Sequence, residues 1–283
     1  MPYIIELELT PLDNNPLPVT LSYNSYALFL NILRISAPAL ADRLHEIDGP
    51  KPFTTAVVFS ADQRRARPIS RSMKYLSLRL TFLSDEVFAY FLKSAMEWST
   101  RELQLGSSHY QVKQVQLVDF DKPTKTFCSY EELLSAATVE HNITLHFLTP
   151  TAFRSEGKRN VLFPQPELIF GSLFNRWNAF STIKIDADLQ PCFSSDILLS
   201  RYKLETRMIN FGNYQETGFT GQCSFILADV LAMEQVQHIN ALADFAVYSG
   251  VGAKTTMGMG QTRRIKSGSA LSHRARYNIK QER

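Results

Sequence analysis

Apolar and polar side chains follow the same pattern twice along this chain of 283 residues. In the first half, residues 2–10 alternate apolar with polar positions, as a half-buried strand does. Apolar residues then recur at helical spacing over residues 23–35, and Ser36 with Pro38 begins a second helical stretch that ends at Gly49. The first half therefore opens with a strand and a helical region.

The rest of the first half supplies three more strands and one more helix. Strands are predicted at residues 52–59, 74–83 and 109–120, with a basic loop between the first two. Ser84 can cap a helix over residues 85–98. The resulting order is β-α-β-β-α-β, which is that of a ferredoxin-like domain.

The second half repeats this order without residue-level similarity to the first half. The expected elements are a strand at 141–149, a helix at 166–180, strands at 201–211 and 219–227, a helix at 233–247 and a strand at 258–266. The sequence therefore predicts an α+β protein with two tandem ferredoxin-like domains.

The domain boundaries follow from this repeat of architecture. The expected parts are residues 1–122 and 141–267 as the two domains, residues 123–140 as a connector, and residues 268–283 as a basic tail. The N-terminal domain would carry the candidate catalytic histidine discussed below, and the C-terminal domain would carry a glycine-rich loop.

The composition is ordinary for a soluble globular protein, with 45% hydrophobic and 20% charged residues. The cysteines Cys128, Cys192 and Cys223 lie too far apart for a metal-binding pattern and indicate a reducing cytoplasm. Glu6 and Glu8 interrupt the apolar run that a signal peptide would need, and no apolar stretch approaches membrane-spanning length. We therefore expect a cytoplasmic protein with no membrane partner.

Positive charge is concentrated in two segments, although the whole chain has a net charge of only +3. Residues 262–283 hold seven Lys or Arg and one Glu, and residues 60–74 hold five Lys or Arg and one Asp. Solvated loops and tails are the common explanation of one such cluster. Concentrated positive charge beside a glycine-rich loop is also typical of a polyanion site.

The glycine-rich stretch covers residues 248–261, YSGVGAKTTMGMGQ, and contains two G-x-G pairs. Glycine adopts positive φ angles and lets a backbone approach a ligand closely. A Walker phosphate loop would need glycine in place of Tyr248 and Ala253, and a dinucleotide fingerprint would need it in place of Thr255 and Arg263. Both nucleotide-binding interpretations therefore fail, and the structural alternative is a turn that only closes a helix.

The pattern G-hydrophobic-G-x5-G-hydrophobic-G near a C-terminus resembles the signature loop of the RAMP (repeat-associated mysterious protein) superfamily of CRISPR RNA-binding proteins. Within that superfamily, the chain is similar to the CRISPR repeat-processing endoribonucleases. The similarity extends to LHEIDGPKPFT (44–54), TPTAFRSEGKRNVLFPQPELIFGSLFNRWN (149–178) and TGFTGQCSF (217–225). It implies two ferredoxin-like domains, and CRISPR repeat RNA as the partner, both as precursor and as mature guide RNA.

His45 and Lys51 are the first candidates for catalysis. His45 borders the buried face of the second helical stretch, and Lys51 lies in a Pro-Lys-Pro turn that favours extended backbone. On their own, such residues are more often solvated surface groups. The resemblance implies a catalytic histidine and lysine at these positions. It also implies a tyrosine from the preceding helix, for which the sequence offers Tyr23 and Tyr26; we favour Tyr26.

These residue types suit transesterification within RNA. Histidine can take the proton of a ribose 2′-OH or give one to the leaving 5′ oxygen. Lysine can stabilise charge on the phosphoryl oxygens, and tyrosine can orient the phosphate or act as the complementary acid. The products would be a 2′,3′-cyclic phosphate and a 5′-hydroxyl. The sequence shows no clustered carboxylates or histidines for a metal, so we expect no cofactor.

RNA-binding candidates come from basic loops and from the glycine-rich stretch. Guanidinium groups contact phosphates and stack on unpaired bases, although any single loop arginine is more often only solvated. Backbone amides of a glycine-rich loop can meet an RNA backbone. The candidates are Arg64, Arg65, Arg67, Arg154, Lys158, Arg159 and Arg176 in the basic segments, and Gly250, Gly252, Lys254, Thr255, Gly258 and Gly260 in the glycine-rich loop.

Three functions are left to distinguish. The first is a metal-independent endoribonuclease that cuts CRISPR repeats and can stay bound to its product within an effector complex. The second is a non-catalytic RAMP subunit that only binds guide RNA in such a complex. The third is a ferredoxin-like module for protein interaction or for a small ligand. His45 with Lys51 favours the first function, and the concentrated basic segments count against the third.

Overall fold

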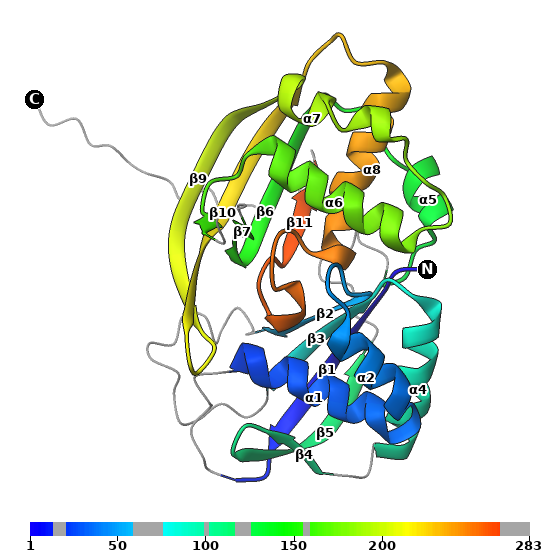
Figure 1. Cartoon of the computed structure of the whole chain (residues 1–283), viewed down its shortest axis with the longest axis vertical. Coiled ribbons are helices and arrows are strands. Elements are labelled where there is room, and N and C mark those ends of the chain that lie inside the picture. Colours follow the sequence, from blue (N-terminus) through cyan, green and yellow to red (C-terminus); the bar gives the residue numbers. More distant parts are fainter. Residues whose placement is uncertain (14–20, 59–75, 99–101, 117–125, 155–158, 267–283) are drawn as a thin grey trace, which may run out of the picture.

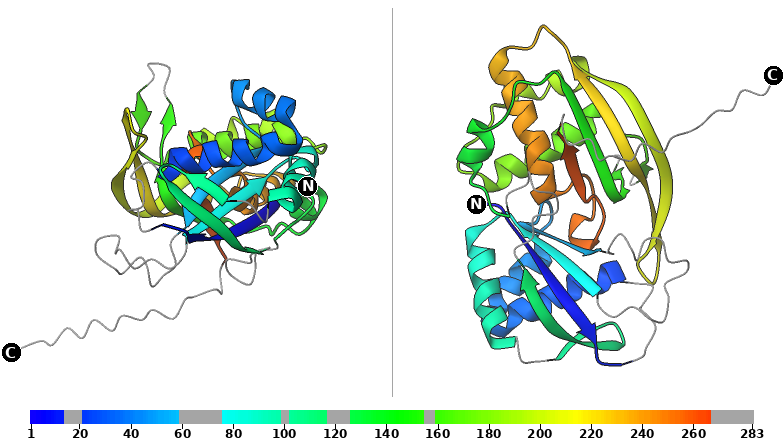
Figure 2. Two further views of the ribbon diagram at one scale, coloured as in Figure 1. Left: turned by 90° about the horizontal axis from the view of Figure 1, so that it is seen from below. Right: turned by 180° about the vertical axis from the view of Figure 1, so that it is seen from behind.

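The computed structural model describes residues 1–13, 21–58, 76–98, 102–116, 126–154 and 159–266 (Figure 1). These residues form two antiparallel sheets of five and four strands, together with a short hairpin. The two sheets occupy separate halves of the molecule, and the glycine-rich loop, residues 250–261, lies between them (Figure 2). None of the helices in these ranges is long and apolar enough to cross a membrane.

The first sheet has the strand order β2-β3-β1-β5-β4. Its strands are β1 (Tyr3–Pro11), β2 (Phe53–Val58), β3 (Leu76–Phe82), β4 (Glu102–Leu105) and β5 (Ser108–Gln116). Its helices are α1 (Leu21–Ser36), α2 (Pro38–Glu46) and α4 (Asp85–Trp98). Alternate residues of a strand point to the same face, so Ile5, Leu7 and Leu9 of β1 all enter the core formed with these helices.

The second sheet has the strand order β11-β6-β10-β9. Its strands are β6 (Asn142–Thr151), β9 (Ile197–Asn210), β10 (Gln215–Leu227) and β11 (Thr262–Ile265). Helices α6 (Pro166–Phe180) and α8 (Met233–Ser249) cover one face and bury Trp177 against Phe245, with ring centroids 5.3 Å apart. The shorter elements are α5 (Tyr130–Ser135), the hairpin of β7 (Phe153–Arg154) and β8 (Asn160–Val161), α7 (Cys192–Ser195), and the 3-10 turns η1 (Ala187–Leu189) and η2 (Thr255–Met257).

The strand order confirms the predicted α+β fold. In each sheet the first strand of the βαββαβ unit lies between the third and the fourth, as in a ferredoxin-like unit. The last strand was expected at residues 258–266 but begins at Thr262, because Gly258 and Gly260 have φ angles of 85° and 70°, outside the strand region. The sequence pattern also missed β4 and the β7–β8 hairpin, whose strands are too short to show a period.

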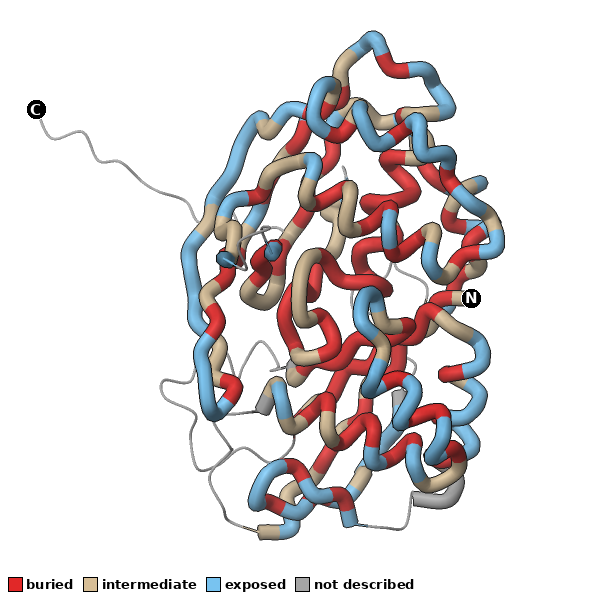
Figure 3. Tube along the Cα trace, in the orientation of Figure 1, coloured by how far each residue is buried: buried red, intermediate tan, exposed pale blue. Residues whose placement is uncertain are grey.

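Buried residues continue from one half of the molecule into the other (Figure 3). Ile4 and Leu83 come from the first half but belong to the hydrophobic core of the second half. The two halves therefore share a packed boundary.

Side chains of β2 and β3 bind carbonyl groups of α8 and of the glycine-rich loop. The contacts are Arg79 Nη2 to Val247 O (2.9 Å), Thr81 Oγ1 to Tyr248 O (2.5 Å) and Thr55 Oγ1 to Thr256 O (2.8 Å). Burial lowers the pKa of Arg79 to about 10, although the charge of Glu6 opposes this shift. Buried donors with satisfied acceptors favour one arrangement, so these contacts hold the glycine-rich loop on the first sheet.

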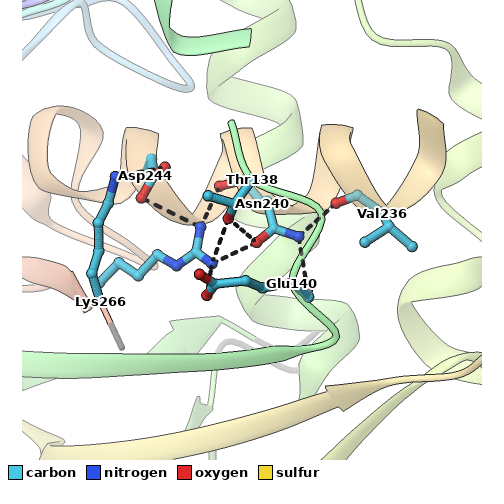
Figure 4. A network of polar contacts seen from close by, with 7 residues as sticks. Thr138, Glu140, Val236, Asn240, Asp244 and Lys266 are labelled. Atoms are coloured by element: carbon cyan, nitrogen blue, oxygen red, sulfur yellow. Dashed lines mark hydrogen bonds and ion pairs between the residues drawn. The ribbon is translucent and has the colours of Figure 1, made fainter. Parts of the chain in front are cut away.

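Strand β11, which follows the glycine-rich loop, is attached to α8 and to the segment before β6 by Arg264. Its guanidinium forms ion pairs with Glu140 at 2.9 Å and Asp244 at 3.4 Å, and donates to Asn240 and Thr138 (Figure 4). The side chain of Arg264 is only 3% exposed. A buried cation needs several partners to offset its lost hydration, so this network anchors one end of the loop.

Candidate active site and nucleic-acid interface

Tyr26 and His45 lie together although they are 19 positions apart in the sequence. Tyr26 Oη is 3.2 Å from His45 Nδ1, and the tautomer of the histidine decides which group donates. Tyr26 is 5% exposed, and its ring stacks on Phe53 of β2 with centroids 6.1 Å apart. His45 is exposed, and its contact through Nδ1 leaves Nε2 as the second nitrogen for proton transfer. The pair joins a fixed phenol to an accessible imidazole.

The surroundings of Tyr26 keep its phenol protonated. Burial, with a smaller contribution from Tyr23, raises the pKa of Tyr26, and Arg34 opposes the shift. Tyr23 itself is 47% exposed. The contact with His45 favours Tyr26 over Tyr23 as the tyrosine of the site, which stays a prediction.

Helix α2 places His45 at its C-terminal end. Pro38 stands in the first turn, where a missing N–H costs no helical hydrogen bond. Leu40, Ala41 and Leu44 form the buried face of the helix. His45 follows Leu44 and lies about 100° further around the helix, so it emerges at the edge of the buried face.

Lys51 caps the C-terminal end of the same helix. Its Nζ donates to three carbonyl oxygens, those of Leu44 (2.5 Å), His45 (3.0 Å) and Ile47 (3.0 Å). An ammonium group has three donors, and these contacts use all of them. Burial lowers the pKa of Lys51, and the charge of Asp48 opposes this shift. Lys51 therefore holds the turn that carries His45.

The four glycines of the glycine-rich loop, residues 250–261, have positive φ angles. Two of them show why glycine is needed. A Cβ at Gly252 would lie 2.5 Å from the carbonyl oxygen of Ala152, and a Cβ at Gly260 would overlap that of Val251. The loop is therefore closely packed against its own backbone and against the segment after β6.

Most amides of this loop donate to other groups of the protein. The donors are Gly250, Val251, Gly252, Ala253, Met257, Met259, Gly260 and Gln261. Thr255 is 1% exposed, and Met259 packs beneath the loop in a small apolar cluster with Ala152 and Phe211. The loop therefore builds the boundary between the two sheets, and its contact with an RNA backbone stays a prediction.

The predicted basic residues lie in different surroundings. Arg154 and Arg159 are exposed, and Arg154 pairs with Glu216. Arg176 is 8% exposed and donates from Nη2 to Gly252 O at 2.9 Å, and burial lowers its pKa to about 10. The neighbouring Trp177 is fully buried. Arg64, Arg65, Arg67 and Lys158 lie outside the described residues.

The register of the second sheet brings together polar residues that the sequence pattern did not single out. Lys203 of β9 lies beside Gln222 of β10, which lies beside His146 of β6 and then Arg263 of β11. Cross-strand partners share a face. Cys223, next to Gln222, is buried on the helix side, so this row occupies the opposite face. Strand pairing created the row, and no sequence motif marked it.

The described residues contain no group of three or more His, Cys, Asp or Glu side chains arranged to hold a metal ion.

Lys254 lies in the glycine-rich loop with its side chain against Tyr214 and Glu216. The structure thus brings Tyr26, His45 and the end of α2 together, and it places Lys254 and Arg154 at a second cluster.

Comparison with known families gives a match to the second half of the chain. The model of the family described as CRISPR-associated endoribonuclease Cas6 matches residues 145–262. This segment runs from β6 to the beginning of β11 and includes the glycine-rich loop.

Two curated Cas6 endoribonucleases are similar to parts of the chain. The protein from Streptococcus thermophilus is 30% identical over 160 residues, which are 53% of this chain and 65% of that protein. The protein from Mycobacterium tuberculosis is 34% identical over 120 residues, which are 42% of this chain and 37% of that protein. The chain therefore matches less than two thirds of the length of these curated relatives.

Solved structures extend the similarity over nearly the whole chain. A Cas6 product complex has a TM-score of 0.82 and 32% identity, and the match covers 94% of this chain and 100% of that one. Thermus thermophilus Cas6 has a TM-score of 0.72 and 30% identity, and the match covers 94% and 98% of the two chains. On this extent of shared sequence and structure, the chain belongs to the Cas6 family of CRISPR-associated endoribonucleases.

Proposed function

We propose that this protein is a metal-independent endoribonuclease that cuts within the repeats of a CRISPR precursor transcript and so produces guide RNAs. The observation that carries the proposal is the pair of Tyr26 Oη and His45 Nδ1, 3.2 Å apart at the end of α2, in a chain of the Cas6 family. A subunit that only bound guide RNA would have no use for an oriented proton-transfer group.

In the proposed reaction, the imidazole of His45 takes the proton from the 2′-OH beside the cut. The 2′ oxygen attacks the adjacent phosphorus, and the bond from phosphorus to the 5′ oxygen breaks. The 5′ oxygen takes a proton from solvent water, and His45 returns to solvent the proton that it accepted. The products are a 2′,3′-cyclic phosphate and a 5′-hydroxyl, and no water is consumed. A positioned acid or base of this kind contributes about 10²–10⁴-fold in rate.

Tyr26 and Lys51 support this step in different ways. Tyr26 orients the imidazole by accepting a hydrogen bond from Nδ1–H, which leaves Nε2 without a proton as the base, and its raised pKa keeps the phenol neutral. Lys51 orients the same residue through the backbone at the end of α2. Stabilisation of the phosphoryl oxygens by Lys51 would require the exchange of one carbonyl contact for phosphate.

RNA is held, in this proposal, by the basic segments, by the glycine-rich loop and by the polar row of the second sheet. The row supports the proposal because Lys203 and Gln222 are exposed beside each other on its surface. A similar solved structure is a Cas6 product complex, which supports retention of the product here as well. Delivery of the bound product to a CRISPR effector complex is a further part of the proposal.

Cleavage of a labelled CRISPR repeat RNA in the presence of a chelator tests the proposal with His45→Ala. His109→Ala is the matched control, because that side chain is 49% exposed and lies on β5. We expect wild type and His109→Ala to cut, and His45→Ala to bind the RNA but cut at least about 10²-fold more slowly. Cutting by His45→Ala at the wild-type rate would contradict the role of His45. Tight binding without cleavage by wild type would instead identify a guide-RNA-binding RAMP subunit.

A further inference from the structure

The long hairpin formed by β9 and β10 reaches from the second sheet to the glycine-rich loop (Figure 1). Phe211 and Tyr214 stack at its tip with ring centroids 5.2 Å apart. Lys254 Nζ lies 4.8 Å and 4.1 Å from the two centroids and donates to Tyr214 Oη at 2.7 Å. A cation over aromatic faces is attracted by the rings, so the loop and the hairpin tip are held together.

Glu216, near the start of β10, completes this contact. Its carboxylate lies 2.9 Å from Lys254 Nζ and 2.7 Å from Arg154 Nη2, and it also accepts a hydrogen bond from Asn160. Its side chain is only 10% exposed. Arg154 and Asn160 are direct partners in the β7–β8 hairpin. One buried carboxylate of β10 therefore binds two segments that are distant from it in sequence.

The surroundings of Lys254 fit an internal partner better than an RNA phosphate. Its side chain is 18% exposed, and Glu216 and Tyr214 occupy two of the three ammonium donors. Its backbone has a φ of 55°, the only positive value at a non-glycine residue in the described part of the chain. Its carbonyl oxygen accepts from Met257 and Met259. A strained backbone of this kind persists where its surroundings determine it, and here the loop and hairpin do so.

We propose that Glu216 is a positioning residue for RNA binding, which joins the hairpin tip, the β7–β8 hairpin and the glycine-rich loop, and that Lys254 and Arg154 act through Glu216. This inference rests on the proposed RNA-binding function and deepens it. It changes the role of two residues that the sequence suggested as direct RNA ligands. It also predicts the opposite of what charge repulsion alone would give. Removal of the negative charge of Glu216 would weaken RNA binding, although RNA is itself a polyanion.

The test measures the affinity of labelled repeat RNA for Glu216→Gln, Lys254→Met and the double variant over a range of salt concentrations. Each phosphate ligand lost lowers the slope of log affinity against log salt by about 0.7–0.9. We expect both single variants to bind roughly tenfold more weakly with an unchanged slope, and the double variant to bind no more weakly than either single one. Binding by Glu216→Gln at or above wild-type affinity would overturn the proposal.

Folding of each variant is checked by thermal unfolding. We expect the two substitutions to lower the unfolding midpoint by less together than the sum of their separate effects, because they remove the same contact. If the shifts of the unfolding midpoint are additive, the proposal is overturned, whatever the RNA-binding data show. If Glu216→Gln does not fold, the salt slope of Lys254→Met decides, and a slope lower by about 0.7–0.9 would identify Lys254 as a phosphate ligand. Absence of RNA binding by wild type would contradict the proposed function. The thermal unfolding data would still show whether the effects of the Glu216 and Lys254 substitutions are coupled.

Discussion

Two side chains act on His45 from different directions. Tyr26 reaches its Nδ1 from α1, and Lys51 binds the carbonyl groups of the turn that carries it. The sequence suggested all three residues, but it gave no means to see that Lys51 binds the backbone. Pro52 favours an extended backbone at Lys51, but this does not determine where the ammonium group at the end of the four-carbon side chain lies.

Replacement of Tyr26 by phenylalanine removes only the hydroxyl that contacts His45. We expect Tyr26→Phe to slow single-turnover cleavage roughly tenfold, because one hydrogen bond that orients the imidazole is lost. RNA affinity should not change. Tyr23→Phe, at an exposed position in the same helix, is the control and should cut at the wild-type rate. A defect in Tyr23→Phe alone would show that the wrong tyrosine was assigned.

Replacement of Lys51 by methionine keeps the length of the side chain and removes its three donors. We expect Lys51→Met to lower the free energy of unfolding by roughly 1.5–3 kcal/mol, the usual value of a hydrogen bond to a charged group, and to slow cleavage. The control is Lys93→Met, an exposed lysine of α4. Urea unfolding monitored by circular dichroism measures the difference. Equal stability of wild type and Lys51→Met would contradict the capping role.

At the scale of elements, periodicity predicted the order of the βαββαβ elements in both halves, but not the short strands β4, β7 and β8 or how the glycine-rich loop is used. The alternation along β1 and β6 indicates one buried face, and hydrophobic spacing indicates α8. The loop looked like a surface for ligand contact because glycine exposes amides. Most of those amides donate to groups of the protein itself. Some of the acceptors, such as the carbonyl groups of Pro150 and Ala152, lie far away in the sequence.

The contact between Glu216 and its cations predicts a dependence of stability on pH. Burial alone would raise the pKa of Glu216, but hydrogen bonds from Lys254 and Asn160 and the charges of Lys254 and Arg154 lower it below its ordinary value of 4.5. A carboxyl with a lowered pKa in the folded state contributes stability above its unfolded pKa, and this contribution is lost as the pH falls through the folded pKa.

We therefore expect wild type to be more stable than Glu216→Gln at neutral pH, and the difference to shrink as the pH falls below 4.5. Unfolding midpoints in urea at several pH values measure it. Glu102→Gln, which removes an exposed carboxyl from β4, is a control that should show no such trend. A constant difference between wild type and Glu216→Gln at all pH values would contradict a charge-based contact.

At the scale of the whole molecule, the two sheets are joined by buried polar contacts as well as by packing. Arg79, Thr81 and Thr55 bind α8 and the glycine-rich loop, and Gln261 donates to Thr54 across the same boundary. The family resemblance in the sequence indicated two such domains side by side. It could not indicate this boundary, because each partner is an ordinary polar residue until the fold brings the pairs together.

The central claim is that a ribose 2′-OH is the nucleophile and that the protein needs no metal to use it. The most direct measurement compares wild-type cleavage of a repeat RNA with cleavage of the same RNA carrying one 2′-deoxy sugar before the cut, both with chelator. We predict cutting of the first RNA with a 2′,3′-cyclic phosphate end, and tight binding without cutting of the second. Cutting of the deoxy RNA at the same position and rate would contradict the account.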